Sequence, residues 1–219
     1  MSAIRISIAD DGEPTRLIYK RVLETQSEFE VVGLAADGEE ALEQAMALVP
    51  DVVVLDIVMP KMNGIQVAQR IMNRHPDTGI VIVSSYAEPA YVSAIMQSGA
   101  RRKAYILKIS LAEISELIRI VQTVANGETV LDATISQRLL KLYDQRFSSP
   151  LGFITEEEIS VLQLMLEGHS TSFMTQTLEM DPGEIAANAA SAYEKLGVVE
   201  QTYGDRISSA VQVLVSQAT

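Results

Sequence analysis

Acidic, hydroxyl and basic side chains stand at the ends of several short apolar runs, where they could do chemistry together. Asp10 and Asp11 follow the run IRISIA, and Asp56 closes VVVLD. Three carboxylates at one place repel one another unless a cation lies among them, and hard oxygen ligands suit Mg²⁺. A carboxylate can attack phosphorus to form an acyl phosphate, and Lys108, which closes YILK, would neutralise the transferring group. The hydroxyl of Ser84, in the run IVIVSS, could then hydrogen-bond the phosphoryl oxygens.

The elements that must bring these side chains together alternate along residues 1–127. Five apolar runs predict strands: IRISIA, VVGLA, VVVLD, IVIVSS and YILK. Helix-like stretches lie between and after them: Pro14–Thr25, Gly38–Leu48, Gly64–Asn73, Tyr91–Ser98 and Leu111–Asn126. Strands that alternate with helices predict an α/β fold, a doubly wound five-stranded parallel sheet with helices on both faces. In such a sheet the functional groups gather at the carboxyl ends of the strands.

Four motifs carry a family resemblance: DD at 10–11, DIVMPKMNG at 56–64, SSY at 84–86 and YILK at 105–108. In this order they make residues 3–127 similar to the flavodoxin-like receiver domain of bacterial two-component response regulators. The resemblance implies that Asp56 is the phospho-acceptor. It also implies a Mg²⁺ site formed by Asp10, Asp11, Asp56 and the backbone carbonyl of Val58.

The same resemblance implies the remaining roles and partners. Ser84 is the switch hydroxyl, Tyr105 the switch aromatic, and Lys108 the amine that contacts the phosphate. A sensor histidine kinase is the expected partner, with a homodimer on phosphorylation. We expect no enzyme activity beyond Mg²⁺-dependent self-phosphotransfer from a phosphodonor and self-dephosphorylation. The basic run at 101–103 is interpreted as a solvated turn, and a partner-docking patch is the alternative.

Residues beyond the receiver predict two further parts. We expect a receiver at 1–127, a linker helix within 128–152, and a small all-α domain at 153–219. Four helices are predicted in the last part, with N-caps or capping boxes at Thr155, Ser170 and Asp181 and stops at Gly168 and Gly197. Short helices joined by tight turns favour a helix-turn-helix fold. The frame from ITEEEISVL to EKLGV resembles the LuxR/NarL-type output domain.

The surface of this C-terminal domain departs from the LuxR/NarL pattern. Residues 151–219 hold two Lys or Arg against ten Asp or Glu, a net charge of −8, whereas DNA affinity comes largely from cations at phosphates. Where the family pattern has basic residues, this chain has Glu156, Glu158 and Gly183. Asn188 and Lys195 are the remaining candidate DNA contacts. We therefore expect output through protein interaction or dimerisation; a phosphorylation-controlled, DNA-binding transcription regulator is the alternative.

Composition excludes several classes of site. The chain has no cysteine, which excludes disulfides and thiolate chemistry. No apolar run approaches the ~20 residues of a membrane span. The N-terminus MSAIRISIADD has the pattern of a strand rather than of a signal peptide. The sequence therefore predicts a cytoplasmic protein without a membrane partner.

Overall fold

A computed structural model of the 219-residue chain describes residues 3–96, 99–112, 115–146, 154–199 and 202–218. The chain forms two compact units. The N-terminal unit comprises Met1–Ala87 and Arg102–Glu128, and the C-terminal unit comprises Glu88–Arg101 and Thr129–Thr219. The predicted division at 127 and 152 remains a prediction. Among the described residues, no helix is long and apolar enough to cross a membrane.

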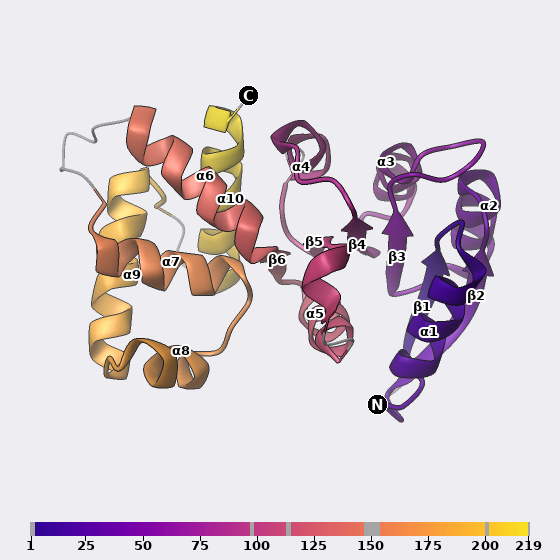
Figure 1. Cartoon of the computed structure of the whole chain (residues 1–219), viewed down its shortest axis with the longest axis horizontal. Helices are drawn as coiled ribbons and strands as arrows, with labels where there is room; N and C mark the ends of the chain where they lie inside the picture. Colours follow the sequence, from indigo (N-terminus) through magenta and orange to yellow (C-terminus); the bar gives the residue numbers. More distant parts are fainter. Residues whose placement is uncertain (1–2, 97–98, 113–114, 147–153, 200–201, 219) are drawn as a thin grey trace. The chain divides into compact units, whose positions relative to one another are not determined.

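The sheet confirms the predicted α/β architecture. Its strands are β1 (Ile4–Ala9), β2 (Phe29–Ala35), β3 (Val52–Asp56), β4 (Gly79–Ser84), β5 (Lys103–Leu107) and β6 (Thr129–Leu131). Their order is β2-β1-β3-β4-β5-β6 (Figure 1). The predicted number of five strands was therefore one too few. The sixth strand has only three residues, all buried, and a run that short carries no periodicity that a sequence reading could detect.

Parallel pairing brings the strand ends to one edge of the sheet. The pairs β1–β2, β1–β3, β3–β4 and β4–β5 are all parallel. In register, Asp56 lies opposite Val83 and Ser84 opposite Leu107. Because neighbouring parallel strands end side by side, the residues that follow them form one cluster at the carboxyl edge.

Helices of the N-terminal unit cover the sheet in two layers. They are α1 (Glu13–Leu23), α2 (Gly38–Leu48), α3 (Gly64–Arg74) and α5 (Glu116–Ala125). Helix α1 packs beside α5, and α2 packs beside α3. The helix predicted from Leu111 differs, because the chain first forms a 3₁₀ turn, η1 (Lys108–Ala112), in which the Leu111 backbone leaves helical geometry.

The segment that follows Asp56 contacts the rest of its unit through close backbone approaches as well as through the ion pair of Lys61 with Asp37. The Gly38 amide donates to the Pro60 carbonyl at 3.2 Å, and the Gly64 amide donates to the Ile57 carbonyl at 2.9 Å. A Cβ on Gly38 would lie 1.9 Å from the Met62 carbonyl oxygen, and one on Gly64 would lie 2.0 Å from the Asp56 carbonyl oxygen. Only glycine allows backbones to approach this closely.

The basic run at 101–103 forms the expected turn only at Arg101 and Arg102. Arg101 is exposed and pairs with Asp205 at 3.0 Å. The Arg102 guanidinium donates to the Ala125 carbonyl at 3.1 Å. Lys103 is buried at the start of β5, and this burial lowers its pKa to about 8. The prediction was wrong for Lys103, because the strand begins two residues earlier than the apolar pattern YILK indicates.

Apart from strand β6, the regular structure of the C-terminal unit is helical. It contains α4 (Pro89–Met96), α6 (Ala133–Arg146), α7 (Glu156–Leu166), α8 (Thr171–Leu178), α9 (Pro182–Leu196) and α10 (Tyr203–Ala218). Helices α7 to α10 are the four that the sequence predicted, drawn in orange to yellow in Figure 1. Helix α6, which lies in the predicted linker, packs against α7 and α10.

Capping residues set the limits of these helices as predicted. Thr155 with Glu158 forms a capping box at α7, and Asp181 with Glu184 forms one at α9. The Ser170 hydroxyl accepts a hydrogen bond from the Phe173 amide at the start of α8. Helix α9 ends at Gly197, whose φ of 73° lies in the left-handed region that glycine favours.

We predict that Gly38→Ala destabilises the protein by about 2 kcal/mol, because its methyl group would overlap the Met62 carbonyl and force the backbones apart. The matched control is Gly204→Ala, whose Cβ has no neighbour within 4 Å and should change stability by less than about 0.5 kcal/mol. Urea unfolding monitored by circular dichroism measures both. Equal midpoints for the two variants would contradict the close approach.

Candidate functional site

Three carboxylates meet at the carboxyl edge of the sheet. Asp10 directly follows β1 and is 2% exposed, and Asp56 ends β3 and is 7% exposed. Asp11 is exposed beside them. Each of the three offers a carboxylate oxygen, and these atoms lie within 4.8 Å of one another. The structure thus brings together the three acids that the sequence predicted as a cluster.

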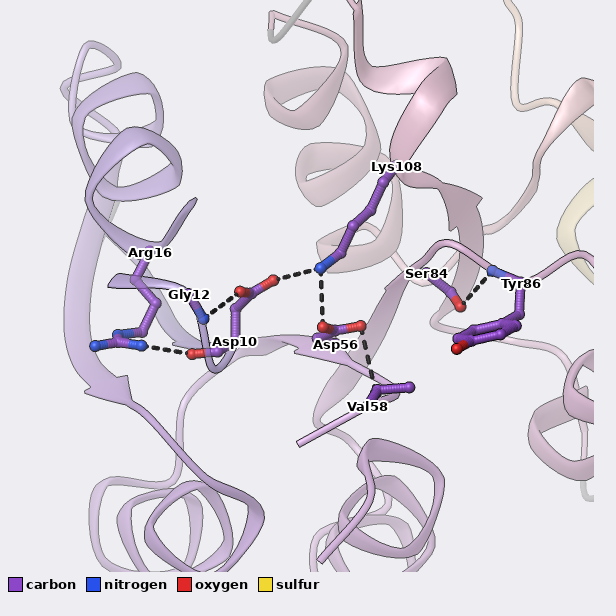
Figure 2. Close-up of polar contacts among 8 residues, drawn as sticks. All are labelled: Asp10, Gly12, Arg16, Asp56, Val58, Ser84, Tyr86 and Lys108. Carbon is purple, nitrogen blue, oxygen red and sulfur yellow. Dashed lines mark hydrogen bonds and ion pairs between the residues drawn. The ribbon is translucent and has the colours of Figure 1, made fainter. Parts of the chain in front are cut away.

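Lys108 supplies the positive charge between two of these acids. Its Nζ lies 2.8 Å from Asp10 Oδ2 and 2.8 Å from Asp56 Oδ2, so that the ammonium bridges both carboxylates (Figure 2). Burial alone would lower the pKa of Lys108, but the hydrogen bonds and charges of Asp10 and Asp56 outweigh burial and raise this pKa above its ordinary value. The lysine therefore stays protonated and offsets the repulsion between the two buried acids.

The chemistry of the cluster fits a hard divalent cation. Mg²⁺ is usually held in proteins by one or two carboxylates with further oxygen ligands, and three carboxylate oxygens converge here. The Val58 amide lies 3.4 Å from Asp56 Oδ1, which fixes the start of the following loop at the site. The Val58 carbonyl, predicted as a further ligand, remains a prediction.

The predicted switch residues lie on the neighbouring strands. Ser84 ends β4, is fully buried, and accepts a hydrogen bond from the Tyr86 amide at 3.0 Å. In Figure 2 the Ser84 hydroxyl points toward this amide, whereas Lys108 reaches down between Asp10 and Asp56. The Tyr105 ring is buried within β5, and its hydroxyl donates to the Tyr86 carbonyl at 2.8 Å. Both predicted switch side chains therefore contact the same residue, Tyr86.

Two residues near the acids were not anticipated from the sequence. The Arg16 guanidinium, from the first turns of α1, donates to the Asp10 carbonyl at 2.6 Å. The Gly12 amide donates to Asp10 Oδ1 at 2.8 Å (Figure 2). Together they orient the turn that carries Asp10 and Asp11. No signal in the sequence indicates the Arg16 contact, because it joins a side chain to a backbone carbonyl, which any residue at position 10 would offer.

Both candidate DNA contacts of α9 are engaged within the C-terminal domain. The Asn188 side chain donates to the Glu184 carbonyl of its own helix at 3.0 Å. The Lys195 ammonium lies 2.8 Å and 2.7 Å from the two carboxylate oxygens of Glu158, and its side chain is 13% exposed.

Glu158 is a core residue rather than the surface substitution that we expected. It is 4% exposed, and it accepts hydrogen bonds from the Thr155 amide, the Ser191 hydroxyl and Lys195. Burial alone would raise the pKa of Glu158, but the hydrogen bonds from Lys195, Ser191 and Thr155 hold the pKa below its ordinary value. The capping-box pattern predicted the contact with Thr155, but α7 and α9 must pack before Lys195 can reach the carboxylate.

Comparison with known families matches residues 6–122 to the response regulator receiver domain. Over the whole chain, the protein is similar to the transcriptional regulatory protein DegU of Brevibacillus brevis. The two are 32% identical over 216 residues, and the match covers 91% of this chain and 90% of DegU.

Solved structures of response regulators are also similar to this chain. A two-component response regulator of the LuxR family from Aurantimonas is 27% identical, with a TM-score of 0.56 over 62% of this chain and 94% of that one. RcsB of Salmonella typhimurium shares the fold, with a TM-score of 0.54 at 22% identity over 92% of this chain and 95% of that one.

The buried ion pair predicts an acid-sensitive C-terminal domain. Because the folded-state pKa of Glu158 is lowered, its stabilising contribution is present above the pKa of an unfolded glutamate and is lost as the pH falls through the folded-state pKa. Lys195→Met should cost about 3 kcal/mol at neutral pH, since it leaves a buried carboxylate without its cation. Urea unfolding between neutral pH and about pH 3 measures both effects.

Glu157→Gln serves as the matched control for this prediction. Glu157 is adjacent to Glu158 but exposed, so that its neutralisation should change stability by less than about 0.5 kcal/mol at any pH. If Lys195→Met and Glu157→Gln gave the same small change, the buried pair would not be a stabilising contact.

Proposed function

Since this chain belongs to the two-component response regulators of the LuxR/NarL class, we propose that Asp56 takes a phosphoryl group from a sensor histidine kinase and that the C-terminal domain responds mainly through protein contacts. The first part rests on the receiver site and the second on the surface of α9. Each part has its own test.

In the proposed transfer, an oxygen of Asp56 attacks the phosphorus of a phosphohistidine on the kinase. The new O–P bond forms as the N–P bond breaks, and the histidine nitrogen keeps the electron pair. Asp10, Asp11, Asp56 and the Val58 carbonyl would hold Mg²⁺, which supplies positive charge beside the phosphoryl oxygens. Lys108, already bonded to the Asp56 carboxylate, neutralises a further part of that charge. Attack of water on phosphorus later breaks the acyl phosphate and releases inorganic phosphate.

The proposed switch begins at Ser84. In this proposal the Ser84 hydroxyl, which accepts a hydrogen bond from the Tyr86 amide, donates its own proton to a phosphoryl oxygen on Asp56 and shifts toward it. Tyr86 is also contacted at its carbonyl by the hydroxyl of Tyr105. A movement of Ser84 is therefore passed to the backbone of residue 86 and to the aromatic side chain of β5.

The ion pair of Lys195 carries the proposal for the output. Lys195 is the one basic residue of α9, and Glu158 contacts it with both carboxylate oxygens. The solvent-facing positions of this helix include Glu184, Ala186, Ala187 and Ala190. Small side chains allow close approach of another helix, whereas phosphate contacts need exposed cations. This surface supports protein interaction or dimerisation as the output.

DNA binding is the second candidate. The relative DegU is named a transcriptional regulatory protein, and the capping box at the start of α9 matches the helix-turn-helix arrangement. Asn188 is half-buried and lines a groove between α7 and α9, where its amide could turn to an adenine edge.

Asp56→Asn should abolish labelling of the protein by acetyl phosphate and Mg²⁺, because the amide cannot form the acyl phosphate. Intact-mass spectrometry detects the added phosphoryl group on the wild type. Asp77→Asn, an exposed aspartate in the turn before β4, should be labelled like the wild type. Labelling of Asp56→Asn at an equal rate would refute the assignment of the acceptor.

Selection of random duplex DNA at low salt, with beryllofluoride and Mg²⁺ activating the receiver, distinguishes the two outputs. We expect no sequence to be enriched relative to Asp56→Asn, while sedimentation velocity detects an activation-dependent dimer. Enrichment that depends on Asp56 would favour the DNA-binding alternative.

The lost cations can also be restored. Gly183→Lys combined with Ala186→Lys places two exposed ammonium groups on α9 and leaves Glu184 in its capping box. We expect about a tenfold gain in affinity for duplex DNA and a steeper salt dependence, measured by fluorescence anisotropy. Lysines at Thr134 and Gln137, exposed on α6, add the same charge as a control. No difference between the two variants would contradict the proposed cause.

A further inference from the structure

A cavity of about 310 Å³ lies within the C-terminal domain, far along the chain from the phosphorylation residues. Buried side chains form its floor: Met165 from α7, Met174 from α8, and Ile185, Ala189 and Tyr193 from α9. Exposed residues at its mouth include Pro182, Ala186 and Ala190. A cavity of this volume falls at the small end of the range of known ligand pockets, about 300–1,000 Å³.

The floor of this pocket suits a planar aromatic ring. Two methionines, Met165 and Met174, line it, and thioethers make favourable contacts with aromatic rings. The Tyr193 ring adds an aromatic surface, and its hydroxyl contacts Met165 Sδ at 3.9 Å. A compact aromatic group can therefore displace water from the floor without leaving a protein polar group unpaired there.

A single cation lines the same pocket. The Cζ of Arg206, from the first turns of α10, lies 5.8 Å from the centroid of the Tyr193 ring. A guanidinium has five N–H donors in a planar fork that matches a carboxylate. Residues 151–219 contain only one other Lys or Arg, Lys195, and Glu158 already pairs with it. Arg206 therefore places a positive charge beside an apolar cavity of this acidic domain.

We propose that this pocket binds a small aromatic carboxylate, with the ring on the floor among Met165, Met174 and Tyr193 and the carboxylate on Arg206. Such a ligand contacts α7, α8, α9 and α10 at once, because each helix contributes to the lining. Its binding raises the unfolding temperature of the domain as its concentration rises. The C-terminal domain thus carries a small-molecule input that is separate from Asp56.

The test uses the full-length protein with ¹³C-labelled methionine methyl groups. Benzoate, 3-phenylpropionate and indole-3-acetate are each titrated and followed by NMR. We expect saturable shifts of the Met165 and Met174 methyl signals, while Met59 and Met72 of the N-terminal unit stay unchanged. The uncharged 3-phenylpropionamide should bind at least about tenfold more weakly than 3-phenylpropionate, since it lacks the charged partner of Arg206.

Variants separate the two halves of the site. Arg206→Gln should weaken 3-phenylpropionate about tenfold and leave the amide unaffected. Ala186→Leu, at the exposed mouth, should weaken both ligands by steric overlap. Arg74→Gln, an exposed arginine in the last turn of α3, is the control for loss of a positive charge and should bind like the wild type.

The proposal is overturned if none of the three acids gives saturable shifts of Met165 and Met174. It is also overturned if the acid and the amide bind equally, or if Ala186→Leu binds 3-phenylpropionate like the wild type. A circular dichroism spectrum of each variant shows that the helices are retained, so that a loss of binding is assigned to the pocket.

Discussion

Two buried carboxylates share one ammonium group, and the geometry of the receiver site depends on this arrangement. Asp10 directly follows β1 and Asp56 ends the adjacent strand β3, so the sheet brings them together whatever their charge. Two such groups in a poorly solvated place cannot both ionise cheaply without a cation. Lys108 provides it from the end of β5, and in the proposed transfer the same ammonium would also contact the phosphoryl group. The arrangement of the strands therefore brings the two carboxylates together and also places the lysine that offsets their repulsion.

The sequence predicts most of this site because period-two apolar runs have clear ends. Once the runs are read as parallel strands, the residues that follow them must share one edge, and Asp10, Asp56, Ser84 and Lys108 are found there. The features that the sequence did not predict are those that leave no repeating pattern of apolar residues. Strand β6 is three residues long, and the burial of Lys103 depends on where β5 starts rather than on residue type.

In the C-terminal domain, local sequence signals predict where the helices begin and end, but they do not predict which side chains are exposed. Capping boxes and the left-handed glycine at residue 197 fix the helix limits from neighbouring residues alone. The fate of an ionisable side chain depends on tertiary packing instead. Glu158 was assigned to the surface by comparison with a family pattern, but it is buried, and its partner Lys195 lies 37 residues away. Counting charged residues gives the sign of the net charge of the domain, while only the packed structure identifies which charged side chains are exposed to solvent.

The two sides of the carboxylate site at Asp56 are held by different kinds of contact. On one side, Gly38 and Gly64 bring the backbone after Asp56 into direct contact with the chain beside it, so this side cannot yield without overlap of atoms. On the other side, Ser84 accepts a hydrogen bond from the Tyr86 amide, and Tyr105 donates one to the Tyr86 carbonyl. In the proposed switch, a phosphoryl group on Asp56 would meet close backbone packing on the side of Gly38 and Gly64. The movement would then be directed toward β4 and β5, whose side chains contact Tyr86.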